Sequence, residues 1–182
     1  DEKSLDKYGQ YPWPRNIYSE IMLDTHYSNT HVFTQVFNQP DRFGGDEKFA
    51  EGLVNRLSIL SAAPTSQKDT GSAPYVRTSV FGGGNIGDVI WAFSGMSAPI
   101  KILQDNTYGV GVTVSTPPLP DTPNFDGTVR SAPLIVSAND QIYPSVALET
   151  LRAFYDQPNY QTRVTPEVGI EWIRMGRQPP VE

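Results

Sequence analysis

Carboxylates and arginines gather beside glycines at two places in the sequence. Asp41 and Asp46 flank a segment that begins with Arg42 and ends in two glycines, and Asp126 precedes a glycine, with Arg130 close behind. Such groups at strand ends can form a polar site for a ligand or an ion. The structural alternative is that Asp126 forms a turn and Asp46 caps a helix, since aspartate favours both positions. The sequence favours the structural roles without excluding a site.

An aromatic residue near the N-terminus could likewise have either a binding role or a structural role. Trp13 stands between two prolines, and Arg15 follows directly. A rigid indole can anchor a ligand or a partner, but more often it fills the core beside the start of a helix. Because loops carry most binding residues, we select ligand-binding candidates by loop position. These candidates are Trp13, Arg15, Asp41, Arg42, Asp126 and Arg130.

Motifs for catalysis are incomplete. Residues 82–87 fit the glycine pattern of dinucleotide-binding loops, but the chain reaches Pro99 too soon for the helix that must follow. The segment around Ser97 lacks the second glycine of a nucleophile elbow. His26 and His31 are five residues apart, a spacing that does not place them on one helical face for a metal. We therefore predict no catalytic residue, no metal ligand and no cofactor.

The composition narrows the class of protein. The 182 residues carry a formal net charge of -6, contain no cysteine and are 38% hydrophobic. Such a chain can bury a core, and its charge argues against nucleic acid as a partner. Disulfides and thiolate chemistry are excluded. The sequence contains no apolar run long enough for a membrane span and no signal peptide.

Helical and extended patterns alternate irregularly along the chain. This alternation predicts an α/β (mixed α+β) class, with one mixed central sheet and packed helices in a single domain over residues 1–182. Asp46 and Ser145 are the expected N-caps. We expect helices near residues 15–23, 46–57 and 145–155, and extended segments near 30–37, 58–63, 75–81, 99–103, 109–115, 129–136, 163–164 and 169–175.

Several ordered blocks of the sequence resemble a known family. The blocks are residues 1–5, 9–15, 37–42, 44–46, 124–134, 143–151 and 169–176. Together they resemble a CHASE domain of the second type, an extracytoplasmic sensory module of bacterial receptors. Residues 58–108 match the family poorly. The family usually has an acidic residue where this chain has Gln35, and a hydrophobic strand before Asp1.

The resemblance implies that the chain senses and does not catalyse. It would be excised from a longer receptor, tethered by flanking membrane helices outside the cytoplasm (periplasmic or extracellular) and linked to an adenylate cyclase, diguanylate cyclase or kinase. Its partners would be an unknown small-molecule ligand and a second copy in a homodimer. Two alternatives stay open: a dimerisation module without a ligand, and a secreted hydrolase that uses paired carboxylates such as Asp41 with Asp46 or Asp126 with Asp140.

Overall fold

The computed structural model describes residues 15–67, 69, 71–114 and 132–180 of the chain. Four α-helices, one 3-10 helix and ten strands lie within these residues. The mixed α/β class predicted from the sequence is confirmed. The strands do not form one central sheet, because they divide among three small sheets.

The first sheet is built around strand β2 (Ser58–Thr65). Strands β1 (His31–Phe33) and β6 (Gly109–Val112) pair with β2 in parallel, and β5 (Gly95–Ser97) pairs antiparallel with its C-terminal end. The first five residues of β2 are all buried. A run of small and apolar residues suits a central strand that is covered on both faces.

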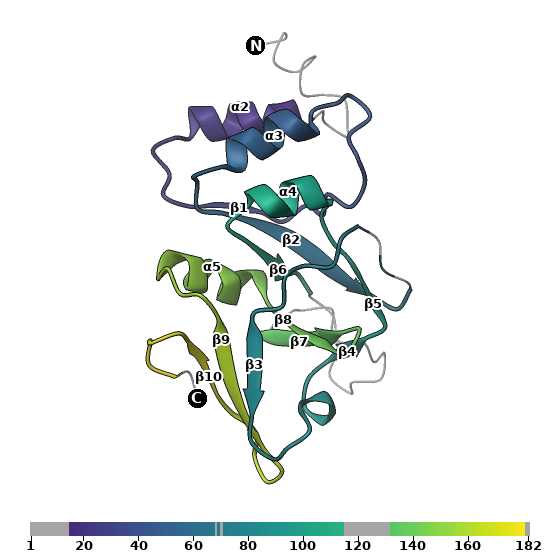
Figure 1. The fold of residues 1–182 in the computed structure, drawn as a ribbon, viewed down its shortest axis with the longest axis vertical. Coiled ribbons are helices and arrows are strands. Elements are labelled where there is room, and N and C mark those ends of the chain that lie inside the picture. The colour runs from purple at the N-terminus through teal and green to yellow at the C-terminus, as the bar shows by residue number, and fades with distance from the viewer. Residues whose placement is uncertain (1–14, 68, 70, 115–131, 181–182) are drawn as a thin grey trace, which may run out of the picture.

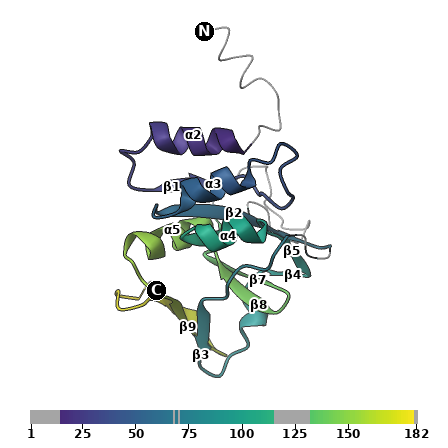
Figure 2. The ribbon, with the colours of Figure 1, turned by 45° about the horizontal axis from the view of Figure 1, so that its top comes forward.

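Helices cover both faces of this sheet, as Figures 1 and 2 show. One layer contains helices α2 (Asn16–Asp24), α3 (Asp46–Leu53) and α4 (Lys101–Asn106). Beneath this layer the rings of Tyr18, Phe37 and Phe49 pack with centroids 5.1–5.3 Å apart. The two pairs that involve Phe37 are edge-to-face, and such packing strengthens a core beyond the area that it buries.

Helix α5 (Val146–Phe154) packs on the opposite face, against β2 and β6. The glycines of β6 allow this close approach. A Cβ atom on Gly111 would lie 2.5 Å from the Val146 Cα, and one on Gly109 would lie 2.0 Å from a Glu149 carboxylate oxygen. Both contacts are shorter than packed atoms tolerate, so side chains at these two positions would push α5 off the sheet.

Two further sheets form the other half of the molecule (Figure 1). Their inward side chains and α5 share a core made of Ile135, Ile142, Leu148, Tyr160, Ile173 and Met175. One sheet has the order β10-β9-β3 and the other β4-β7-β8. Their elements are β3 (Thr78–Phe81), β9 (Tyr160–Thr165), β10 (Gly169–Met175), β4 (Ala92–Phe93), β7 (Ile135–Ala138) and β8 (Gln141–Pro144), with the 3-10 helix η1 (Ile86–Asp88) before β4.

Most predicted elements are present, but two local predictions are wrong. Residues 99–103 were expected to be extended, yet helix α4 begins at Lys101. Its single turn and a half shows too little periodicity to be recognised, and Pro99 precedes it. Asp46 is the first residue of α3 and not its cap; Gly45 takes the cap position without a side-chain bond. The Asp46 side chain instead turns towards Arg15.

Element lengths also differ from the predictions. Helix α3 ends at Leu53 and not near residue 57, because Asn55 adopts a left-handed φ of 59°. The strand expected over 30–37 is shorter in the structure, where β1 has three residues, His31–Phe33. Ser145 is confirmed as the N-cap of α5, where its hydroxyl accepts a hydrogen bond of 3.2 Å from the Leu148 amide. Caps of this type stabilise a helix by about 1 kcal/mol.

Candidate functional site

Two of the predicted ligand-binding residues meet in one network, the Arg15 cluster, formed by Arg15, Gln39, Asp41, Gly45 and Asp46. The Arg15 guanidinium donates to the Asp46 carboxylate and to the Gln39 carbonyl. The Arg15 amide donates to Asp41 Oδ2 at 2.9 Å. The Arg15 and Asp46 side chains are only 9% and 12% exposed. The cluster therefore ties the loop at residues 39–46 to the start of helix α2.

The carboxylate of Asp41 is occupied by backbone donors. It accepts hydrogen bonds of 3.1 Å from the amides of Phe43 and Gly45, in addition to that from Arg15. Partial burial raises the pKa of Asp41, but the three amides and the Arg15 charge outweigh it and lower that pKa overall. Asp46 in turn accepts a bond of 2.9 Å from the Asp41 amide. The two carboxylates thus hold a turn through bonds to Arg15 and to backbone amides.

The other candidates lie apart from this network. Arg42 is exposed at the rim of a shallow hollow of about 390 Å³ lined by Arg15 and residues 35–43. Gln35, at the position where the family usually has an acid, accepts a hydrogen bond of 2.5 Å from the Tyr18 hydroxyl. A carboxylate oxygen there would accept the same bond. Trp13, Asp126 and Arg130 lie outside the described residues, so their roles stay predictions.

A second charged network is fully buried. Glu149 and Arg152 of α5 form a two-bond ion pair at 2.7 and 3.0 Å, with side chains 1% and 2% exposed. The Tyr160 hydroxyl of β9 donates to the same carboxylate at 2.5 Å. Burial first, and the Glu149 charge next, raise the pKa of Tyr160. Arg152 also donates to the backbone carbonyls of Gln157 and Tyr108. The network of Glu149, Arg152 and Tyr160 therefore links α5 to β9 and, through the Tyr108 carbonyl, to the residue before β6.

An apolar pocket of about 290 Å³, which we call the Trp91–Trp172 pocket, opens where the two smaller sheets meet. Residues 89–91 after η1, residues 133–135 at the start of β7, and residues 170–173 of β10 line it. Both indoles are half-buried. Its size is near the lower end of the range for pockets that hold small ligands. Among the described residues, this pocket has the predominantly apolar, aromatic lining that such ligands require.

Sequence reasoning did not select this pocket. The sequence shows its parts separately: Val89–Phe93 is an apolar run, and Trp172 lies in a predicted strand. Pairing these segments requires the tertiary structure, since about 80 residues separate the two indoles along the chain. Apolar residues in short runs are as typical of a core as of a pocket.

The histidines and acids of the described chain do not converge on a metal. No group of three such side chains lies close enough within these residues. His31 contacts the Thr25 hydroxyl at 2.8 Å, and His26 contacts the Leu23 carbonyl at 3.1 Å. Across the described ranges, no helix combines the length and apolarity needed to cross a membrane.

The described residues thus form a mixed α/β fold with internally bonded charged clusters and an apolar pocket. Comparison with protein families identifies the class of protein. The CHASE2 domain model matches residues 1–180, and the chain therefore belongs to the CHASE2 family. This is a family of extracellular sensory domains of signalling receptors. The resemblance seen in the sequence is thus confirmed.

A curated relative, annulin from Schistocerca americana, is 28% identical over 101 residues. The alignment covers 48% of this chain and 13% of annulin, so the chain spans a small part of that relative's length. No solved structure matches the chain.

Proposed function

We propose that this chain is the ligand-sensing input domain of a transmembrane receptor whose output is an adenylate cyclase, a diguanylate cyclase or a kinase. In this arrangement the domain lies outside the cytoplasm and is held by membrane helices of the longer protein. The observation that supports the proposal is the CHASE2 match over residues 1–180. The domain binds and does not catalyse; bond-making belongs to the output domain.

Ligand binding would act on the receptor by shifting a conformational equilibrium. A ligand can do this only as far as its affinities for the two states differ. The Trp91–Trp172 pocket suits such a role because its lining residues come from separate elements, β10, β7 and the segment before β4. A ligand held between these elements changes their relative positions more readily than one bound on a single rigid element.

The full-length protein tests this function directly. Its gene must encode membrane helices next to this domain and a cyclase or kinase domain on the other side of the membrane. In membranes from cells that express it, ligand added to the outer face must change cyclic nucleotide synthesis or phosphorylation. Absence of any flanking membrane helix, or an output that never depends on this domain, would refute the proposal.

A dimerisation module without a small ligand is the second candidate, and helix α5 favours it. This helix buries its charged Glu149 and Arg152 and exposes Leu151, Phe154 and Tyr155. Phe154 is 62% exposed, and its ring packs edge-on against Tyr155 with centroids 5.4 Å apart. Exposed aromatic residues are enriched where proteins associate. We therefore propose that this helix face contacts a second copy of the chain.

Sedimentation velocity over a range of protein concentrations measures this association. The wild-type chain should shift towards a dimer as its concentration rises, and Phe154→Ser should remain a monomer at the same concentrations. Val168→Ser, which changes another exposed apolar residue, is the matched control. A monomer at every concentration, or an equal loss of dimer in the control, counts against α5 as the interface.

A further inference from the structure

The outer face of the β10-β9-β3 sheet carries a row of aromatic and cationic side chains. In the strand register, Phe81 and Trp172 are the cross-strand partners of Arg163 on either side, and Arg174 is the partner of Gln161. Cross-strand partners share a face, and residues two apart along a strand share it too. These five side chains, which we call the arginine face, therefore lie together and line a hollow of about 500 Å³.

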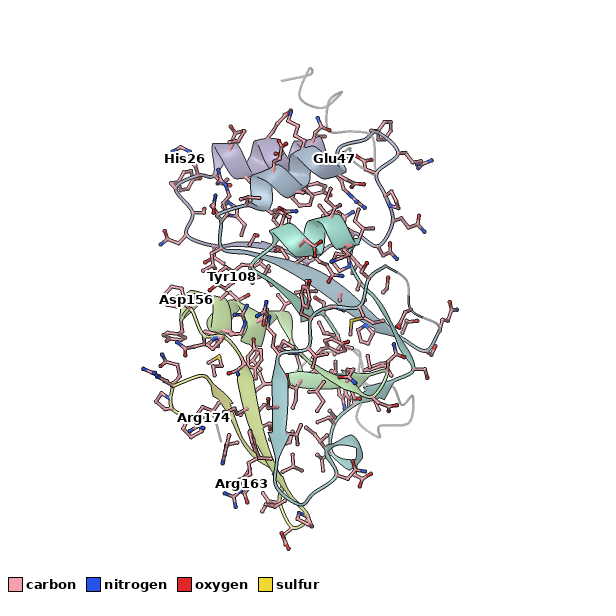
Figure 3. All side chains as sticks on the ribbon, viewed as in Figure 1. His26, Glu47, Tyr108, Asp156, Arg163 and Arg174 are labelled. Atoms are coloured by element: carbon pink, nitrogen blue, oxygen red, sulfur yellow. The ribbon has the colours of Figure 1, made fainter. Side chains whose placement is uncertain are left out.

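Of the two arginines of this face, Arg163 is exposed and Arg174 is half-buried. The Arg174 guanidinium donates to Gln161 Oε1 through its Nε, at 3.1 Å, and through its Nη2, and it lies over the Trp172 ring at 5.3 Å. The Arg163 Nε is 3.1 Å from a Glu171 carboxylate oxygen, with side chains 53% and 31% exposed. Figure 3 shows Arg163 and Arg174 on the same side of the molecule, along β9 and β10. Gln161 uses the Nε–Nη2 edge of Arg174 and Glu171 faces the Nε of Arg163, so an incoming anion would meet the Nη1 atom of Arg174 and the two Nη atoms of Arg163.

A β-bulge joins the arginine face to the Trp91–Trp172 pocket. The β10 register shifts between Ile170 and Trp172, so Glu171 is the additional residue. Bulges of this kind re-aim side chains at functional edges of sheets. Here Trp172 lines both the apolar pocket and the arginine hollow. The two hollows are therefore neighbours that share Trp172.

The charges at this junction favour an anion. Arg163 and Arg174 supply two positive charges, and Glu171, which lines the apolar pocket, supplies one negative charge. The local balance is positive on a chain whose net charge is -6. A carboxylate is bound well by the planar guanidinium group, which donates two parallel hydrogen bonds. An apolar group fits the adjoining pocket.

We propose that these two hollows form one site for an amphipathic monoanion: a carboxylate that bears a medium-length alkyl chain or an aromatic ring. The apolar part occupies the Trp91–Trp172 pocket, and the carboxylate lies against Arg163 and Arg174. Glu171 opposes the anion and weakens its binding. This inference rests on the proposed sensory function and adds the class of ligand.

Sodium decanoate, used below its critical micelle concentration, is the probe. Binding to the 182-residue chain is followed by the fluorescence of its tryptophans and by isothermal titration calorimetry. Decanol and decyltrimethylammonium have the same chain length with a neutral and a cationic head. Decanoate should bind at least about tenfold more tightly than either control, because only its head gains charge-assisted hydrogen bonds. Equal affinity for decanol and decanoate, or no saturable binding, would overturn the proposal.

Three substitutions locate the head group. Arg163→Gln and Arg174→Gln should each weaken decanoate binding about three- to tenfold, as expected for a partly exposed charge contact. Glu171→Gln should tighten it about threefold, because it removes a repulsion. None of the three should alter decanol binding. Arg177→Gln changes an exposed arginine that lines neither hollow and is the matched control. Unchanged affinity in all three variants, or equal weakening in the control, would place the anion elsewhere and refute this site.

Circular dichroism and thermal unfolding of each variant separate lost binding from lost folding. The Glu171→Gln variant keeps the test decisive, since misfolding cannot produce tighter binding. The outcome is also independent of the receptor test. A full-length receptor that responds to another ligand, while the isolated chain ignores decanoate, would remove this proposal and leave the proposed function in place.

Discussion

Arginines serve two different purposes in two regions of this molecule. Arg15 and Arg152 are buried, and their donors are used by carboxylates and backbone carbonyls of their own chain. Arg163 and Arg174 lie on an outer sheet face beside aromatic rings, where Arg163 is exposed and Arg174 is half-buried and bonded to the neutral Gln161. An arginine that lies near acidic residues in the sequence can therefore serve a structural ion pair as readily as it can bind a ligand.

The physical basis of the difference is desolvation. A buried guanidinium must be bonded completely, because an unpaired buried charge costs several kcal/mol. An exposed guanidinium keeps its hydration and can exchange water for a ligand. Substitutions should therefore change the stability of the chain in the first region and its binding in the second.

The largest effect is expected at Arg152. Arg152→Met leaves the Glu149 carboxylate buried without its partner and should lower the free energy of unfolding by about 3–5 kcal/mol. Urea denaturation measures the loss. The double variant Arg152→Met with Glu149→Leu removes both charges and should lose less than the single variant. A single-variant loss below about 1 kcal/mol would show that the buried pair does not support the fold.

A smaller effect is expected at Arg15. Arg15→Met removes the partner of a nearly buried Asp46 and the bond to the Gln39 carbonyl, so we expect a loss of about 2–3 kcal/mol in the same measurement. Arg42→Met, which changes an exposed neighbour, should remain within about 0.5 kcal/mol of wild type. Equal effects of the two substitutions would contradict the structural role of the Arg15 cluster.

Acid should weaken the Arg15 cluster through Asp41. Because the folded state lowers the pKa of Asp41 below its usual 3.8, this carboxylate stabilises the fold fully at pH values above 3.8. The contribution is lost as the pH falls below 3.8 and through the lowered folded-state pKa. Asp41→Asn should therefore reduce the pH dependence of the thermal midpoint in that acidic range. An unchanged pH dependence would show that Asp41 titrates alike in both states.

The smallest effect on stability is expected at the arginine face. Arg174→Gln removes a half-buried charge that is bonded to the neutral Gln161, so the free energy of unfolding should change by less than about 1 kcal/mol. The thermal midpoint measured without any probe gives this value. A large loss would mean that Arg174 belongs with the structural arginines, and the contrast between the two regions would fail.

The family resemblance, the mixed class and most elements were predictable from sequence. Ser145 shows why, since an N-cap followed by apolar residues at helical spacing is a local pattern. The three-sheet division was not predictable, because strand pairing depends on contacts between distant segments. Helix α4 was missed because a six-residue helix carries no clear period. Arg15 and Asp41 were each chosen as ligand-binding candidates by loop position, and nothing in the sequence indicated that they bond to each other.

The sequence by itself determined the chemistry that is present: an acidic chain without cysteine, with CHASE2 blocks in order and with caps and turns at readable positions. Tertiary structure decided which charged side chains are bonded inside the fold and which remain at the surface. Asp46 and Arg15 are 31 residues apart and join, whereas Arg163 and Arg174 remain at the surface. Burial and hydrogen-bond partners set the cost and availability of a charge, and both arise only when distant segments pack together.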